Sequence, residues 1–190
     1  TADKRVVNCL PKQFSVRSKV HEYGGGAYCV ADDNLVYCNY ADQQLYRCHL
    51  PSRDIAQLTN SERSRFADMD FDAKRNSLFA VQEHHSPDGA VHNALVRVTM
   101  SQTPRLEIVQ QGADFYSNPR VSPDQTMLAW LSWAHPNMPW DGCELWLAKL
   151  NEHGLIQEKK RIAGGDNESI CQPSWSPDGD LYFISDRSNW

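Results

Sequence analysis

A turn-and-strand unit recurs along this chain of 190 residues, and it constrains the fold more than any other feature. Its two clearest copies read NPRVSPDQTML, at residues 118–128, and QPSWSPDGDL, at residues 172–181. In each copy a short strand precedes a polar turn, and an apolar strand follows. Leu35 and Leu78 begin similar apolar strands, so the copies are spaced by 43, 50 and 53 residues. This spacing is typical of the four-stranded blades of β-propellers and not of helical repeats.

The turn in each copy has the residues that a tight hairpin needs. Proline pre-sets φ at the first turn position, aspartate suits the second, and Gly179 can adopt the left-handed conformation. Gln125 replaces this glycine in the third copy, which predicts a more strained turn there. Residues 86–89 also read SPDG, but they fall out of period and are interpreted as a loop.

We therefore predict an all-β fold, a partial β-propeller of about three and a half four-stranded antiparallel blades. The blades are expected at residues 23–58, 65–110, 117–162 and 172–190, and no segment shows sustained helical periodicity. Strands are predicted at residues 27–31, 35–40, 44–50, 54–58, 66–71, 78–82, 94–99, 106–110, 119–122, 127–133, 144–150, 157–162, 173–176 and 181–185. Because the last blade holds two strands, sheet edges stay unpaired, and we expect the chain to self-associate through them.

Composition excludes several classes of partner. With 19 basic and 24 acidic residues the net charge is -5, so nucleic acid is not expected to bind. No apolar stretch approaches the roughly 20 residues of a membrane helix. The six cysteines form no C-x-x-C pair and are interpreted as buried or half-buried thiols. A cytoplasmic location is expected, or a periplasmic one if a signal peptide has been removed.

No cofactor or metal is expected. His84, His85 and His92 lack the spacing of a zinc site and are interpreted as part of a solvated polar loop. The glycines at residues 24–26 are followed by a strand and not by a lysine and a helix. Close backbone packing is therefore favoured there over a phosphate cradle.

Antiparallel strands alternate in direction, so the loops that lead into each blade and those between second and third strands should lie on one face, which we call the loop face. Loops on a rigid scaffold often carry binding residues. The segments expected on the loop face are residues 21–26, 83–93, 112–116, 134–142 and 164–170.

The run WAHPNMPWDG, at residues 133–142, is unusually apolar for a loop. Two interpretations remain open: a surface that contacts substrate or another domain, or a loop that folds back over the core. Glu22 could in addition anchor a charged end of a substrate. The residues proposed for substrate contact or domain docking are Glu22, Tyr23, Trp133, His135, Met138, Trp140 and Asp141.

Several motifs resemble one peptidase family. They are HEYGGGAY at residues 21–28, QLYR at 44–47, NPR at 118–120, HPNMPWD at 135–141 and QPSWSPDG at 172–179. They resemble the propeller of bacterial dipeptidyl aminopeptidase/acylaminoacyl-peptidase-like enzymes, in the prolyl oligopeptidase family of serine peptidases. The similarity runs from about His21 to Trp190. SPDG turns are common to many propellers, whereas the first and fourth motifs are more specific.

The resemblance implies an α/β-hydrolase domain with a Ser-Asp-His triad beyond Trp190, packed on one face of the propeller. It implies that the propeller admits short peptides and excludes folded proteins. No G-x-S-x-G motif occurs in the chain, and none of the matched motifs carries a catalytic residue, so no catalysis is expected from these residues alone.

Two alternative functions remain. A stand-alone propeller similar to TolB would act as a scaffold for protein partners, without a hydrolase domain. Carbohydrate binding by the aromatic loop is less favoured, because tryptophan-rich loops suit protein docking equally well.

Overall fold

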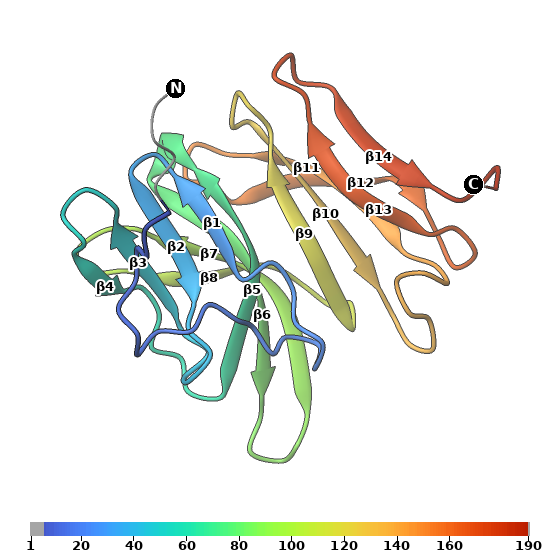
Figure 1. Cartoon of the computed structure of the whole chain (residues 1–190). Coiled ribbons are helices and arrows are strands. Elements are labelled where there is room, and N and C mark those ends of the chain that lie inside the picture. The colour runs from blue at the N-terminus through green and yellow to red at the C-terminus, as the bar shows by residue number, and fades with distance from the viewer. Residues whose placement is uncertain (1–5, 190) are drawn as a thin grey trace.

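The computed structural model describes residues 6–189, and four antiparallel sheets make up most of this part of the chain (Figure 1). Three sheets have four strands and the fourth has two. Within each sheet the strands lie in chain order, as in the blades of a propeller. The predicted all-β fold, a partial propeller of about three and a half blades, is confirmed.

The first sheet contains β1 (Tyr28–Ala31), β2 (Asn34–Cys38), β3 (Leu45–His49) and β4 (Ile55–Gln57). The second contains β5 (Ser64–Asp72), β6 (Ser77–His85), β7 (Val91–Thr99) and β8 (Leu106–Gln111), with the 3₁₀ helix η1 (Ala73–Arg75) between β5 and β6. The third contains β9 (Phe115–Val121), β10 (Met127–Trp133), β11 (Glu144–Leu150) and β12 (Ile156–Gly164). The fourth pairs β13 (Ile170–Trp175) with β14 (Leu181–Ser185). Within residues 6–189, η1 is the single helix, and none there could span a membrane.

The first strands of successive sheets lie side by side. Contacts join β1 to β5, β5 to β9, and β9 to β13, so the sheets radiate from their first strands. Figure 1 shows the resulting arc, which runs from the first sheet to β13 and β14 and stays open between these two ends. The first strand of each sheet therefore lines the inner side of the arc.

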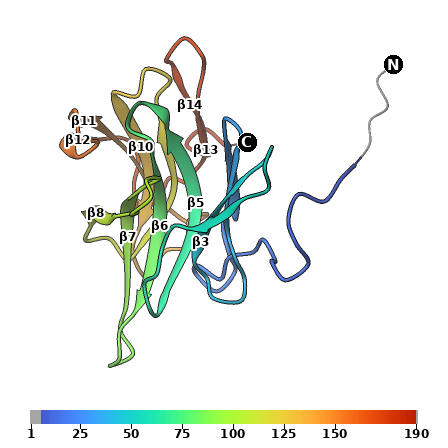
Figure 2. The ribbon, with the colours of Figure 1, turned by 90° about the vertical axis from the view of Figure 1, so that its left-hand side faces the viewer.

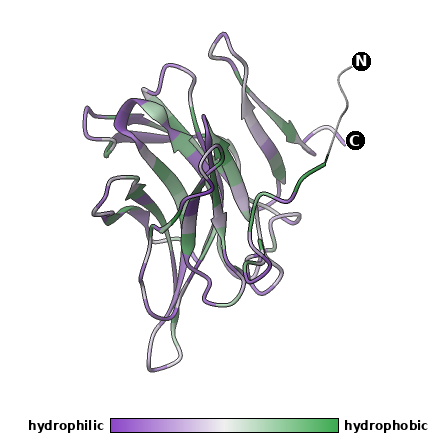
Figure 3. Cartoon of the chain, turned by 60° about the vertical axis from the view of Figure 1, so that its left-hand side comes forward, coloured by the Kyte–Doolittle hydropathy of each residue, from purple (hydrophilic) through white to green (hydrophobic). Residues whose placement is uncertain are grey.

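Apolar side chains fill the space between neighbouring sheets. Strand β6 shows this most clearly: Leu78 and Ala80 pack toward the first sheet, whereas Phe79 and Val81 pack toward the third. This alternation follows from the two-residue period of a strand, and it makes β6 hydrophobic on both faces. Figure 3 shows hydrophobic residues gathered along the strands. Burial of one side chain as large as that of Phe79 stabilises the fold by about 2–3 kcal/mol.

The N-terminal segment covers the other face of the first sheet. Leu10, Phe14 and Val16 pack against the buried Tyr37, whose ring meets that of Phe14 edge-on at 5.7 Å. Figure 2 shows this segment approaching the sheet from one side. The cover is partial, because Tyr28 and Val30 of β1 are each 61% exposed.

Most strands match their predicted positions. Strands β10, β11 and β14 have the predicted bounds. The others differ from the predicted bounds at one or both ends, and β9 and β13 begin four and three residues before their predicted starts. They begin at Phe115 and Ile170, whereas the prediction began them at Pro119 and Pro173.

A recurring β-bulge explains this error. The pairing register shifts near Asp68 in β5, near Asn118 in β9 and near Gln172 in β13, and these residues have φ values of 54°, 51° and 53°. The prolines directly follow two of these bulged residues. Because a bulge interrupts the ladder, a proline there removes no required hydrogen bond and the strand continues.

The second correction concerns the hairpin of the second sheet. A loop was expected over residues 83–93, but β6 and β7 continue the ladder, in which Glu83 pairs with Asn93 and His84 with His92. Only residues 86–90 form the turn, and the hairpin extends beyond the rest of the sheet (Figures 1 and 2). The three histidines of this region therefore lie on strands, and their interpretation as part of a loop was wrong.

The strained turn expected in the third sheet is present. Gln125 has φ of 60°, in the left-handed region where Gly179 of the fourth sheet has 92°. A side chain with a Cβ atom is unfavourable in this region, so the same turn is better suited to glycine.

Candidate functional site

The segment that leads into the first sheet is anchored to the second sheet. The backbone nitrogen of His21 donates a hydrogen bond of 2.7 Å to Glu83 Oε2. The ring of His21 meets the rings of Phe115 and Trp133 edge-on, at centroid distances of 5.2 and 5.4 Å. This segment therefore contacts residues from two further sheets at one end of the arc.

The loop between β10 and β11 is fastened to both neighbouring loops. His135 N donates to Asp114 Oδ2 at 2.9 Å. Asn137 Nδ2 donates to the carbonyl of Asp166 at 2.8 Å, and Ser169 Oγ donates to the carbonyl of Pro139 at 2.9 Å. These contacts bring the loops at the ends of β8, β10 and β12 together, as the alternation of strand direction predicts.

Trp133, at the end of β10, and Trp140, within the loop, have different roles. Trp133 is 5% exposed and stacks on Phe115 at 5.4 Å, so it belongs to the core between the third and fourth sheets. Trp140 is 65% exposed. The two interpretations of the apolar loop therefore each apply to one tryptophan: Trp133 caps the core, and Trp140 is available for contact.

A pocket of about 460 Å³ lies where the first strands and these loops meet, and we call it the aromatic pocket. Tyr23, which is 60% exposed, and Trp140 lie at its wall, and Trp133 lies deeper. Its lining residues are His21, Tyr23, Gly24, Gly25, Asp68, Ser117, Asn118, Leu131, Trp133, Pro139, Trp140, Ser169, Ile170 and Cys171. Three of the seven predicted site residues thus share one pocket.

The remaining predicted residues lie elsewhere. His135 packs edge-on against Phe115 at 4.9 Å and lines a separate pocket of about 360 Å³. The carboxylate of Asp141 accepts a hydrogen bond of 3.0 Å from the backbone nitrogen of Met138, and its own nitrogen donates to the Met138 carbonyl. These two residues therefore close a turn within the loop and do not line the aromatic pocket.

Asp68 is the pocket residue that sequence reasoning missed. Its Oδ1 accepts a hydrogen bond of 2.5 Å from Gly26 N, and its Oδ2 accepts one of 3.0 Å from Asn118 N. One carboxylate on the second sheet therefore joins the first and third. Alignment of Asp68 with Asn118 and Gln172 across the repeats would have indicated that position.

The glycine run allows this close approach. A Cβ atom on Gly25 would lie 2.9 Å from the Ala67 Cβ and 3.0 Å from Asp68 Oδ1. A Cβ atom on Gly26 would also lie 3.0 Å from that oxygen. Gly24 has φ of 88°, which favours glycine in itself. Close backbone packing, the favoured reading of this run, is what the structure shows.

His21 is held in the neutral state. Burial lowers the pKa of its imidazole, and the nearby carboxylates of Glu83 and Asp68 only partly oppose this effect. Its Nε2 atom is buried and has no hydrogen-bond partner among the described residues. Its φ is 55°, and that of Glu22 is 65°. Two consecutive residues with a Cβ atom thus adopt an unfavourable backbone conformation at the pocket.

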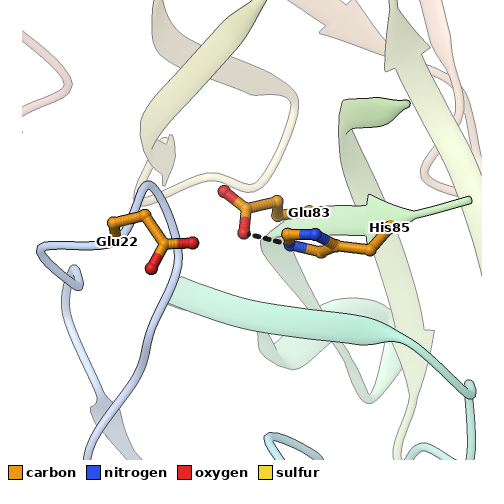
Figure 4. A group of neighbouring side chains, drawn as sticks. All are labelled: Glu22, Glu83 and His85. Carbon is orange, nitrogen blue, oxygen red and sulfur yellow. Dashed lines mark hydrogen bonds and ion pairs between the residues drawn. The ribbon is translucent and has the colours of Figure 1, made fainter. Parts of the chain in front are cut away.

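Glu22 does not line the aromatic pocket, and its carboxylate belongs to an ionic cluster that Figure 4 shows with Glu83 and His85. Arg65 Nη1 lies 2.6 Å from Glu22 Oε1 and 3.0 Å from Glu83 Oε1, and His85 Nε2 lies 2.7 Å from the same Glu83 oxygen. The hydrogen bond and charge of Arg65 lower the pKa of Glu22.

The same cluster has the donor set of a possible metal site, since the three ligand atoms lie within 4.8 Å of one another. A divalent ion there would lie beside the positive charge of the Arg65 guanidinium, which already forms ion pairs with both carboxylates. These residues therefore fit an internal ion network better than a metal ligand set.

All six cysteines are free thiols. Burial raises the pKa of Cys29 and of Cys38 to about 12 each, and it also raises the pKa of Cys143. Because the thiolate is the nucleophile, these buried cysteines are unreactive at neutral pH.

The radiating sheets and the loop-face pocket define this chain as part of a β-propeller. Among solved structures, a puromycin hydrolase mutant complexed with PGG is 30% identical, with a TM-score of 0.86 over 95% of this chain. A puromycin-hydrolysing peptidase of Mycobacterium tuberculosis is 31% identical, with a TM-score of 0.80 over 96% of this chain. This chain spans 30% of the length of each of these proteins.

The predicted resemblance to the propeller portion of prolyl-oligopeptidase-family serine peptidases is thus confirmed. A putative TolB of Agrobacterium tumefaciens, 20% identical with a TM-score of 0.57 over 80% of this chain and 54% of its own, shares the fold alone. No family model matches the chain, and no curated protein sequence does.

Proposed function

We propose that this chain is the propeller part of a serine exo- or oligopeptidase, and that it admits and helps to select short peptides. The bonds would be cleaved by an α/β-hydrolase domain of the same protein, which packs on the loop face. The observation that carries this proposal is the identity of 30–31% to puromycin-hydrolysing peptidases over nearly the whole chain.

The shape of the loop face supports this role. The aromatic pocket opens where first strands and loops meet, and Tyr23 and Trp140 remain largely exposed beside it. Exposed tyrosine and tryptophan side chains give contact area with little loss of conformational entropy. In this proposal they contact the peptide, while the fastened loop that carries His135, Met138 and Asp141 meets the hydrolase domain.

The proposal is tested on the complete protein with a fluorophosphonate probe, which reacts with an activated serine. We expect one labelled serine at a position outside these 190 residues. We also expect the complete protein to hydrolyse puromycin and short peptides. A complete protein without a labelled serine would contradict the proposal.

The propeller's own part in the reaction is tested with Trp140→Ala. Because Trp140 lies on the substrate path in this proposal, we expect a higher KM for peptides and an unchanged rate of fluorophosphonate labelling. An unchanged KM would show that Trp140 does not contact the substrate.

A further inference from the structure

The aromatic pocket contains one carboxylate whose charge is not balanced. Asp68 is the one acidic residue in the lining, which contains no lysine or arginine. Within residues 6–189 its carboxylate forms no ion pair. Its two known partners are backbone N–H groups, and these leave one further acceptor position on each oxygen. The pocket is therefore electronegative.

The histidine beside this carboxylate does not neutralise it. Burial lowers the pKa of His21, so its ring is neutral at pH 7 even though the charge of Asp68 opposes that shift. Burial raises the pKa of the Tyr23 hydroxyl, and the charge of Asp68 adds to this effect.

Aromatic side chains line the same pocket as the carboxylate. Tyr23, Trp133 and Trp140 line the same pocket, and two of these side chains are more than half exposed. Cations are attracted to the faces of tryptophan and tyrosine rings, and apolar groups gain from the same surface. A carboxylate within such walls suits a cation that is attached to an apolar group.

The backbone fixes the positions of three residues that line the pocket. Asp68 and His21 occupy the left-handed region, with φ of 54° and 55°, and Asn118 does so with 51°. Asp68 and Asn118 are the bulge residues of β5 and β9, so the fold itself holds their backbones in this conformation. Here they set the direction of the groups that line one pocket.

The sequence hypothesis placed the anchor for a charged substrate end at Glu22 instead. That carboxylate is already paired with Arg65 at 2.6 Å, and Glu83 behind it shares the same guanidinium. A ligand cation there would have to displace or face a fixed positive charge. Asp68 has no such competitor, so it is the better anchor.

We propose that the aromatic pocket binds a primary ammonium group of a peptide, with Asp68 as its counter-ion and Tyr23 and Trp140 against the adjoining apolar atoms. This inference rests on the proposed function in that it takes a peptide as the ligand. The ammonium is carried either by the peptide's amino terminus or by a lysine side chain.

The test measures binding to the 190-residue chain by calorimetry, without catalysis. The probes are Phe-Gly-Gly-amide with a free amino terminus, its N-acetylated form, and N-acetyl-Lys-Gly-Gly-amide. We expect one of the two ammonium-bearing probes to bind at least about tenfold more tightly than acetylated Phe-Gly-Gly-amide. Preference for the first probe identifies the amino terminus, and preference for the third identifies the lysine side chain.

Two variants test whether Asp68 is the carboxylate that binds the ammonium group. Asp68→Asn should weaken the preferred probe by at least about tenfold. The matched control is Asp70→Asn, because Asp70 also lies on β5 and also accepts from the third sheet, at 2.7 Å from Val121 N, but does not line the pocket. This control should bind as the unaltered chain does. If Asp68→Asn does not fold, the comparison of acetylated and free probes on the unaltered chain decides the question.

Equal binding of acetylated and ammonium-bearing probes, or no binding of either ammonium-bearing probe, would overturn the inference. So would an Asp68→Asn variant that folds and binds the preferred probe with unchanged affinity. Neither result depends on fluorophosphonate labelling of the complete protein, so the failure of this inference and the failure of the proposed function are distinguishable.

Discussion

The carboxylate of Asp68 joins two blades, because its Oδ2 lies 3.0 Å from the backbone nitrogen of Asn118 on the next sheet. Two residues further along β5, Asp70 Oδ2 lies 2.7 Å from Val121 N. Successive aspartates of one first strand thus accept hydrogen bonds from the first strand of the following blade. These bonds connect the sheets where no β-ladder runs between them.

Loss of the Asp68 carboxylate should therefore weaken the packing of the blades. Asp68→Ala leaves the N–H groups of Gly26 and Asn118 without this acceptor, and we expect the free energy of unfolding to fall by about 1–3 kcal/mol. Urea unfolding measures this change. Asp88→Ala, which removes one exposed bond within the hairpin turn, is the control and should change stability by less than about 0.5 kcal/mol. Equal effects of the two variants would contradict the bridging role.

Arg65 and Glu22 should differ in how much each contributes to the free energy of unfolding, although they form one ion pair. Arg65→Ala leaves Glu83, whose side chain is 4% exposed, without its positive partner, and we expect a loss of about 2–4 kcal/mol. Glu22→Gln removes a carboxylate that is 78% exposed, where solvent screens its charge, so we expect a much smaller loss of stability. Thermal or urea unfolding of both variants checks the order, and a larger effect of Glu22→Gln would disprove it.

His21 should make stability depend on pH. Its pKa in the folded chain is lowered from the ordinary value of 6.5, so below that value the unfolded chain binds the proton more readily than the folded chain does. The contribution of neutral His21 is fully present above pH 6.5 and is lost as the pH falls toward the folded pKa. We expect urea midpoints to fall between pH 7.5 and about pH 5.

The control for this pH dependence is His21→Asn, which removes the titrating group and tolerates a positive φ. Its midpoints should vary less with pH than those of the unaltered chain over the same range. Identical pH profiles for the two proteins would assign the effect to other groups.

The open ends of the arc should lead to self-association. At one end of the arc, the side chains of Tyr182 and Ile184 on β14 are 63% and 43% exposed. At the other end, Tyr28 and Val30 on the first sheet are each 61% exposed. Apolar sheet faces and unpaired edges favour contact with another chain. Light scattering of the 190-residue chain should give a mass above that of the monomer, and Tyr182→Lys together with Ile184→Lys should reduce it. A monomer mass at working concentration would refute self-association.

Local features of the sequence predicted much of the fold. The two-residue alternation in strands such as 127–133, and the turn residues at Gly179, act over a few neighbouring positions and can be read without a structure. The bulges were missed because proline was taken as the start of a strand, and only the pairing with the adjacent strand shows that Pro119 and Pro173 lie inside one.

The candidate site was only partly predictable from sequence. The sequence by itself determined that Tyr23 and Trp140 lie on loops of one face, with Trp133 at the end of the strand that leads into one of these loops, because strand direction alternates along the chain. Only the tertiary structure decided that Trp133 is buried while Trp140 is exposed, and that Arg65 pairs with Glu22. It also decided that Asp68 lies in the pocket without an ion pair to any residue of 6–189. The contacts of Glu22 and of Asp68 join residues that are more than 40 positions apart in the chain. No local sequence pattern encodes which side chain binds which distant partner.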